Sequence, residues 1–184
     1  MVIKKYIAFL TLIIFIQNTA TADEVVKAGD LVLTSAWGRA STSIKRPGAI
    51  YLSIKNNSSD SDWLIAAQTP AAKRAELHRH FVDNGVMKMR QIKAIEIPAT
   101  EITLLKPGSF HIMLFELKSL LKKGDALPLS LTFVNAGKVT IKAHVVNIGS
   151  RKPDKKSGEH IHKKIMGHKK LGADHINQNT SSAK

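Results

Sequence analysis

The sequence contains no cysteine among its 184 residues. Without cysteine the protein forms no disulfide bond, no thiolate metal site and no iron–sulfur cluster, and it has no cysteine nucleophile. A blue-copper electron-transfer site is excluded as well, because that kind of site needs a cysteine thiolate. We also expect no lipid anchor of the type that is attached through an N-terminal cysteine.

Acidic and aromatic residues are scarce. The chain has 14 Asp and Glu against 28 Lys and Arg, which gives a net charge of +14, and aromatic residues make up 5%. A hydrophobic content of 43% is ordinary for a globular chain of this length, which is enough for one domain with a core. Such a basic balance favours acidic partners or anionic lipid.

The N-terminus has the pattern of a secretory signal peptide. A positively charged start precedes an apolar run over residues 7–16, and the small residues Ala20-Thr21-Ala22 follow. We expect residues 1–22 to be removed, so that the mature chain begins at Asp23. The alternative is a membrane anchor, but the apolar run is shorter than the roughly 20 residues that a spanning helix needs. We therefore expect export and no stable membrane insertion.

Residues 23–150 are expected to form one all-β domain. Many short apolar segments with β-branched residues alternate with turn signals such as Lys106-Pro107-Gly108, which is typical of a β-sandwich or a small Greek-key barrel. A short helical stretch is predicted only at residues 119–123. The predicted strands are residues 49–56, 102–105, 110–117, 127–134 and 139–148.

The last segment, residues 151–184, differs from the domain in composition. It is rich in Lys, His, Gly, Ser and Asn, so it cannot bury enough apolar surface to offset the entropy of ordering, and we expect a basic flexible tail. It lacks the aromatic residues that stack on bases, and nucleic acid is not an expected partner. Two interpretations of its histidines stay open: a solvated basic tail, or a second, looser site for Cu(II). The residues concerned are His160, His162, Met166, His168 and His175.

The grouping His111-Ile112-Met113 lies in a predicted strand. Side chains two residues apart in a strand face the same side, so His111 and Met113 share one face while Ile112 and Leu114 face the core. Taken alone, this pair is more typical of a surface histidine beside an incidental methionine than of a metal site.

A second grouping surrounds Asn84-Gly85, which is a strong signal for a two-residue hairpin loop. With that loop, His80 pairs with Met89, and His78 becomes a diagonal neighbour of Met89. Diagonal neighbours lie about 7–8 Å apart, within reach of long side chains. One face of the hairpin thus carries His78, His80, Met87 and Met89, with a polar face containing filler methionines as the alternative.

Histidine and methionine together indicate copper. Thioether sulfur is a soft, neutral ligand that selects Cu(I) and has little affinity for Zn²⁺, Mg²⁺ or Ca²⁺, and neutral imidazole also suits copper. The sequence shows no Ser/His/Asp arrangement around a nucleophile motif, no Gly-rich phosphate loop and no paired-carboxylate site. We therefore expect a metal-binding protein and not an enzyme.

The spacing His78-x10-Met89-x21-His111-x-Met113 resembles the signature of the periplasmic copper chaperone family PCu(A)C. The resemblance extends over roughly residues 31–146. It includes the segments Ala36-Trp37-Gly38-Arg39, Gly48-Ala49-Ile50-Tyr51-Leu52, Ala75-Glu76-Leu77-His78, Gly85-Val86-Met87-Lys88-Met89-Arg90, Leu105-Lys106-Pro107-Gly108 and Leu131-Thr132-Phe133.

The resemblance implies a cupredoxin-like β-sandwich in the periplasm with one exposed Cu(I) site. The implied ligands are His78, Met89, His111 and Met113. It also implies delivery of copper to the copper subunit of cytochrome c oxidase, or exchange with a thioredoxin-like copper chaperone, by a protein that we expect to be a monomer. The alternative function is copper sequestration for storage or resistance.

One position departs from the family pattern. Two residues after the first histidine many members carry methionine, whereas this chain has His80. The hairpin register places His80 directly opposite Met89, while the family pattern assigns the ligand role to His78. We follow the family for the expected ligand set and keep His80 as a spare ligand. Met87 is expected at the rim of the site.

Overall fold

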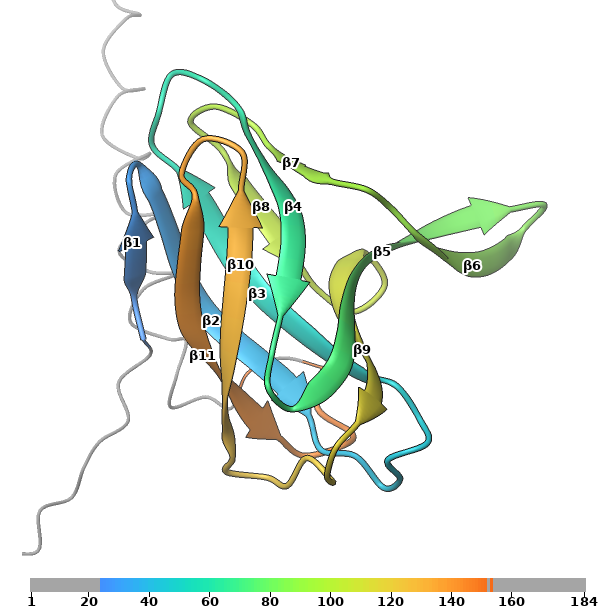
Figure 1. Cartoon of the computed structure of the whole chain (residues 1–184). Coiled ribbons are helices and arrows are strands. Elements are labelled where there is room, and N and C mark those ends of the chain that lie inside the picture. Colours follow the sequence, from blue (N-terminus) through green and yellow to red (C-terminus); the bar gives the residue numbers. More distant parts are fainter. Residues whose placement is uncertain (1–23, 152, 154–184) are drawn as a thin grey trace, which may run out of the picture.

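The structure is a computed structural model and describes residues 24–151 and 153. The predicted signal peptide and the predicted tail, apart from Arg151 and Pro153, lie outside the described residues. The described part contains eleven strands and no helix (Figure 1). Within it, no helix is long and apolar enough to cross a membrane.

The strands are β1 (Val26–Ala28), β2 (Leu31–Arg39), β3 (Gly48–Asn56), β4 (Asp62–Gln68), β5 (Ala72–Asp83), β6 (Val86–Gln91), β7 (Ile95–Ile97), β8 (Ile102–Leu105), β9 (Phe110–Leu117), β10 (Ala126–Phe133) and β11 (Lys138–Val146).

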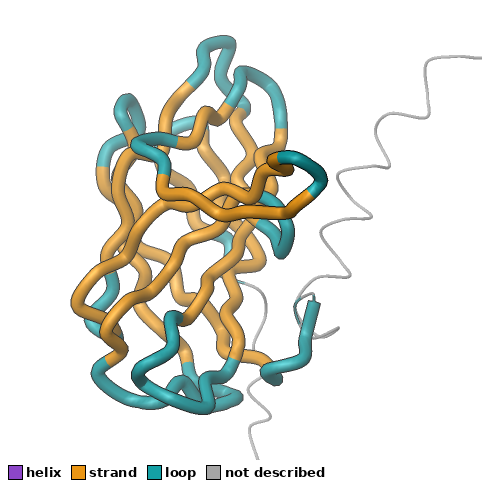
Figure 2. The backbone as a smooth tube through the Cα atoms, turned by 90° about the vertical axis from the view of Figure 1, so that its right-hand side faces the viewer, coloured by secondary structure: helices purple, strands orange, loops and turns teal. Residues whose placement is uncertain are grey.

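All strands belong to one hydrogen-bonded sheet in the order β6-β5-β9-β8-β3-β2-β11-β10-β4-β7, with β1 added beside β2. Most pairs are antiparallel, but β11 pairs with β2, and β8 with β9, in parallel. The strands wrap around a common interior (Figure 2). The predicted all-β, cupredoxin-like architecture is confirmed.

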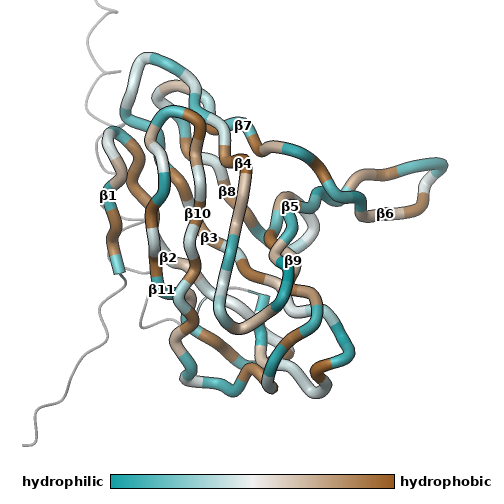
Figure 3. The backbone as a smooth tube through the Cα atoms, in the orientation of Figure 1, coloured by the Kyte–Doolittle hydropathy of each residue, from teal (hydrophilic) through white to brown (hydrophobic). Residues whose placement is uncertain are grey.

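The core follows from the two-residue period of the strands, because alternate side chains of a strand point to opposite faces. In β10, for example, Leu127, Leu129 and Leu131 are buried, while Pro128 between the first two is exposed. Figure 3 shows apolar and polar positions alternating along the strands. Two predicted strands, residues 102–105 and 110–117, coincide with β8 and β9, and the other three agree within two residues at each end.

The predicted helical stretch at residues 119–123 is wrong. The segment is irregular, and the backbone groups of Leu121 bond to Ser41 instead of to a helical turn. The Ser41 N–H donates to the Leu121 carbonyl at 2.9 Å, and the Leu121 N–H donates to the Ser41 hydroxyl at 2.9 Å. Leu121 is buried in the core. Tertiary bonds and burial of one leucine therefore override the local helical preference.

The β5–β6 hairpin extends away from the rest of the strands (Figure 1). Its loop residues Asn84 and Gly85 have φ values of 50° and 76°. Positive φ at both loop residues is the requirement of a type I′ turn, and it explains why Asn and Gly stand there. The register pairs Asp83 with Val86 and His80 with Met89, so the predicted hairpin is confirmed.

Candidate metal centre

Strand β9 carries two of the predicted ligands. Ile112 and Leu114 are completely buried in the core, as expected, and Met113 is half-buried on the opposite face. His111 shares that face with Met113 but is only 2% exposed. The buried ring of Tyr51 lies beside it, with ring centroids 6.4 Å apart, and Tyr51 packs in turn on Trp37. The resemblance implied an exposed site, whereas His111, one of the expected ligands, lies beneath the surface.

The pairing of β5 with β9 brings the two sequence groupings together. His78 stands directly opposite His111, and Glu76 directly opposite Met113. On the other side of β5, His80 stands opposite Met89. Directly opposite residues of antiparallel strands share a face, and so do residues two apart. His78, Met89, His111 and Met113 therefore all lie on one face of three neighbouring strands.

Three imidazole rings lie close together on this face. The ring centroids of His78 and His111 are 6.0 Å apart, and those of His80 and His111 are 4.8 Å apart. His78 also contacts the ring of Phe115, with 5.8 Å between the centroids. The alternative of an isolated surface histidine on β9 does not describe this arrangement, because His111 is buried among aromatic and imidazole rings.

One backbone carbonyl orients two of these rings. The Ser109 carbonyl oxygen lies 2.9 Å from Nδ1 of His111 and 3.3 Å from Nδ1 of His80. A carbonyl only accepts hydrogen bonds, so a neutral ring in this position carries its proton on Nδ1 and leaves the lone pair on Nε2. Ser109 was not predicted from the sequence, because a backbone acceptor leaves no mark on residue type.

Burial lowers the pKa of His111 below its usual value of 6.5, and the Ser109 hydrogen bond opposes this shift. The neighbouring imidazoles of His80 and His78 lower the pKa further by repulsion. The neutral imidazole is the form that binds metal, so the environment of His111 favours its ligand form.

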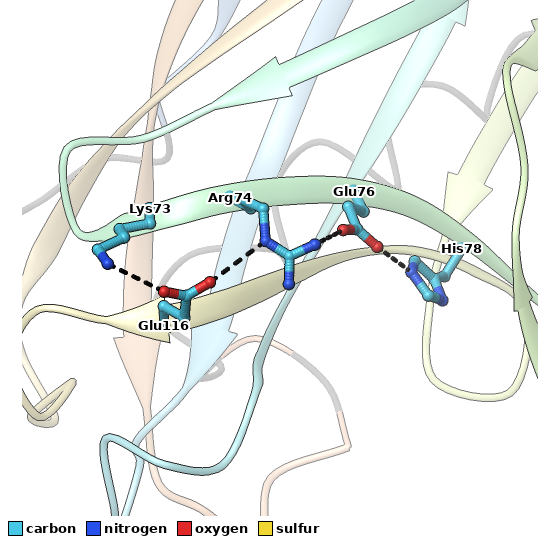
Figure 4. A network of polar contacts seen from close by, with 5 residues as sticks. All are labelled: Lys73, Arg74, Glu76, His78 and Glu116. Atoms are coloured by element: carbon cyan, nitrogen blue, oxygen red, sulfur yellow. Dashed lines mark hydrogen bonds and ion pairs between the residues drawn. The ribbon is translucent and has the colours of Figure 1, made fainter.

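The third ring, His78, is oriented by a carboxylate. Its Nε2–H donates to Glu76 at 3.0 Å. Glu76 also pairs with Arg74, whose guanidinium contacts Glu116, and Glu116 pairs with Lys73 at 3.1 Å (Figure 4). Sequence reasoning missed the role of Glu76, although its position two residues before His78 on the same strand places both side chains on one face.

Exposure increases along this face toward the hairpin tip. His111 is 2% exposed, Met89 is 52% exposed and Met87, opposite Val82, is 62% exposed. In the described part of the chain, His, Asp and Glu side chains alone form no group of three that could hold a metal ion. Within these described residues, a site with three or more side-chain ligands on this face therefore includes a methionine sulfur.

Comparison with known proteins places the chain in a family. Residues 31–145 match the family described as "Putative lipoprotein LpqE-like". The chain belongs to the LpqE-like family. This LpqE-like protein is 32% identical over 108 residues to "Putative lipoprotein Lxx21020" of Leifsonia xyli subsp. xyli. The match covers 58% of this chain and 64% of that protein, so the chain spans less than two thirds of its relative.

Solved structures of PCuAC domains share the fold. The "Copper-bound PCuAC domain from PmoF2" has a TM-score of 0.58 at 22% identity, over 67% of this chain and 98% of that one. "CuI-DR1885 from Deinococcus Radiodurans" has a TM-score of 0.50 at 25% identity, over 66% of this chain and 80% of that one. The resemblance of the LpqE-like chain to the PCu(A)C family, predicted from its motif, is confirmed.

Proposed function

We propose that this protein binds one Cu(I) ion outside the cytoplasm and hands it to another protein. The proposed ligands are His78, Met89, His111 and Met113. The observation that carries the proposal is that four residues from three strands come to one face of β6, β5 and β9. Similarity to domains solved with copper supports the choice of metal.

The donor set suits Cu(I) in particular. Two thioethers and two neutral imidazoles add no negative charge, and thioether sulfur prefers Cu(I) to Zn²⁺. We propose that His111 binds through Nε2, because its Nδ1 is occupied by the Ser109 carbonyl. His78 would bind through Nδ1, because its Nε2–H donates to Glu76. A carboxylate behind a metal-binding histidine fixes the ring and makes it a better donor.

The exposure of the face suits transfer of the ion. Met89, on the projecting hairpin, is accessible to an incoming partner, while His111 anchors the inner side of the site. Neutral ligands that each bind through one atom are released one at a time, so an acceptor replaces them stepwise. This arrangement favours a binding and transfer protein over an enzyme.

The proposed acceptor is the copper subunit of cytochrome c oxidase, or a thioredoxin-like copper chaperone acting beside this protein in the periplasm. Export is supported by membership in a family described as putative lipoproteins. The second candidate function is copper sequestration, which uses the same ligands. The two differ in whether the bound ion leaves the site.

The first test is metal analysis of the purified mature protein under reducing conditions. We expect one copper per chain, with sulfur and nitrogen scattering in the X-ray absorption spectrum. Met113→Ala should lower the Cu(I) affinity by at least about tenfold, since it removes a ligand and second-sphere changes already cost that much. Met87→Ala is the matched control and should leave the affinity unchanged. Zinc in place of copper would refute the proposal.

The second test separates delivery from sequestration. The Cu(I)-loaded protein is mixed with the copper-free soluble fragment of an oxidase copper subunit, and the copper in each is measured after separation. Movement of copper to the fragment supports delivery. If the copper stays on this protein, with the same number of ions per chain as before mixing, the result supports sequestration.

A further inference from the structure

His80 is the histidine nearest to His111, although the family pattern does not assign it as a ligand. Its ring centroid lies 4.8 Å from that of His111, closer than the 6.0 Å of His78. It stands directly opposite Met89 and is half-buried, so its ring lies between the buried end of the face and the exposed hairpin.

We propose that His80 is a metal ligand, and that His80 and His111 together form an imidazole pair that binds Cu(II) on the same face. This inference rests on the proposed copper-binding function. It differs from that function in the ligand and in the oxidation state, because the Cu(I) set uses His78 with two methionines.

The distances fit two rings on one ion. A metal–nitrogen bond of about 2.0 Å puts the ring centroid about 3 Å from the metal, so two rings on one ion have centroids about 4.5–6 Å apart. The 4.8 Å between His80 and His111 lies within this range, toward its lower end, whereas the 6.0 Å between His78 and His111 lies at its upper limit.

The hydrogen bonds fit as well. The Ser109 carbonyl accepts from Nδ1 of both His80 and His111, so both rings keep Nε2 as the nitrogen with a lone pair. The two ligand atoms are thus set by one acceptor and need no change of tautomer on binding. His78 differs, because its Nε2 is held by Glu76 at 3.0 Å.

The chemistry explains why Cu(II) selects this pair. Cu(II) favours nitrogen and oxygen donors in a tetragonal arrangement, whereas thioether sulfur favours Cu(I). Two imidazoles provide the nitrogens and water completes the coordination on the exposed side. The carboxylate of Glu76, which shares the face with the imidazoles, offsets part of the second positive charge. One face therefore offers a nitrogen pair to Cu(II) and a sulfur-rich set to Cu(I).

The test measures Cu(II) binding to the full chain by electron paramagnetic resonance and by competition with a chelator. The tail histidines are removed in the background by the substitutions His160→Ala, His162→Ala, His168→Ala and His175→Ala. We expect this protein to bind one Cu(II) with two nitrogen ligands. His80→Gln in that background should lower the Cu(II) affinity by at least about tenfold. The paramagnetic resonance spectrum of this variant should then show one nitrogen ligand on Cu(II) instead of two.

Controls separate this inference from the proposed function. His144→Gln replaces a half-buried histidine on β11, outside the three strands of the site, and should leave Cu(II) binding unchanged. The Cu(I) affinity of His80→Gln should stay within about threefold of the parent, a difference of about 0.7 kcal/mol. Circular dichroism of each variant checks its folding. Unchanged Cu(II) affinity in folded His80→Gln overturns the inference, whereas failure of the parent to bind Cu(I) overturns the proposed function.

Discussion

The carboxylate of Glu76 holds Nε2 of His78 at a distance of 3.0 Å, on the strand that stands opposite His111. This contact ends a chain of charged side chains that begins at Lys73 and passes through Glu116 and Arg74 (Figure 4). Three of the links lie on the surface, where ion pairs contribute little to stability. The importance of Glu76 therefore lies in the orientation of His78.

Replacing Glu76 by Gln is expected to weaken Cu(I) binding by about tenfold, because an outer partner that fixes a histidine ligand contributes 10–100-fold to metal affinity. Competition with a chromophoric Cu(I) chelator measures the change. Glu116→Gln is the matched control, since it removes a carboxylate from the same network without touching His78, and it should leave the affinity unchanged. Equal losses in both variants would show a general effect of charge.

Replacing Gly85 by Ala is expected to loosen the hairpin. Gly85 has a φ of 76°, which alanine adopts only at a cost of about 1 kcal/mol. Amide hydrogen exchange should accelerate in β6, and Cu(I) affinity should fall, because Met89 loses its fixed position opposite His80. Gly149→Ala is the control, because Gly149 does not have the positive φ of Gly85, and an added Cβ meets no atom within 4 Å at either position. Unchanged exchange in β6 would contradict the role given to the turn.

Replacing Asp62 by Ala is expected to lower stability without changing copper binding. The buried carboxylate accepts hydrogen bonds from the backbone N–H groups of Trp63, Asn135 and Ala136, at 2.7, 2.9 and 2.9 Å. Loss of this acceptor should lower the free energy of unfolding by about 3 kcal/mol. Urea denaturation measures the loss, and Asp62→Asn, which keeps one oxygen acceptor, should lose less. A loss of Cu(I) affinity in folded Asp62→Ala would contradict the prediction that these hydrogen bonds affect stability alone.

The stability of the protein without copper is expected to depend on pH through His111, whose pKa is lowered by burial. Between its folded-state pKa and the unfolded value of about 6.5, the unfolded chain binds more protons, so stability falls as pH falls through this window. Stability is highest above about pH 6.5 and the loss levels off below the folded-state pKa. Urea denaturation between pH 7.5 and 5 checks this, and His111→Gln should show a shallower decline. A steeper decline of stability in His111→Gln than in the parent would contradict this prediction.

The strands that were predicted depend on local alternation, whereas β1, β2, β4 and β7 were not predicted. Residues 102–105 and 110–117 coincide with β8 and β9, where one face is core and the other is not. The turn Asn84-Gly85 was also predictable, because positive φ at two successive positions restricts the residue types. The prediction of a helix at residues 119–123 was wrong because Leu121 forms its backbone hydrogen bonds with Ser41, eighty residues away.

The sequence by itself determined that the chain has no thiolate and carries a His/Met pattern whose spacing indicates its family. It also determined which residues share a face within each strand and within the hairpin, because these relations are local. Only the tertiary structure decided that β5 pairs with β9, which puts His78 opposite His111 and brings His80 within 4.8 Å of it. That pairing joins distant segments, and its register is set by burial of the opposite faces in a common core.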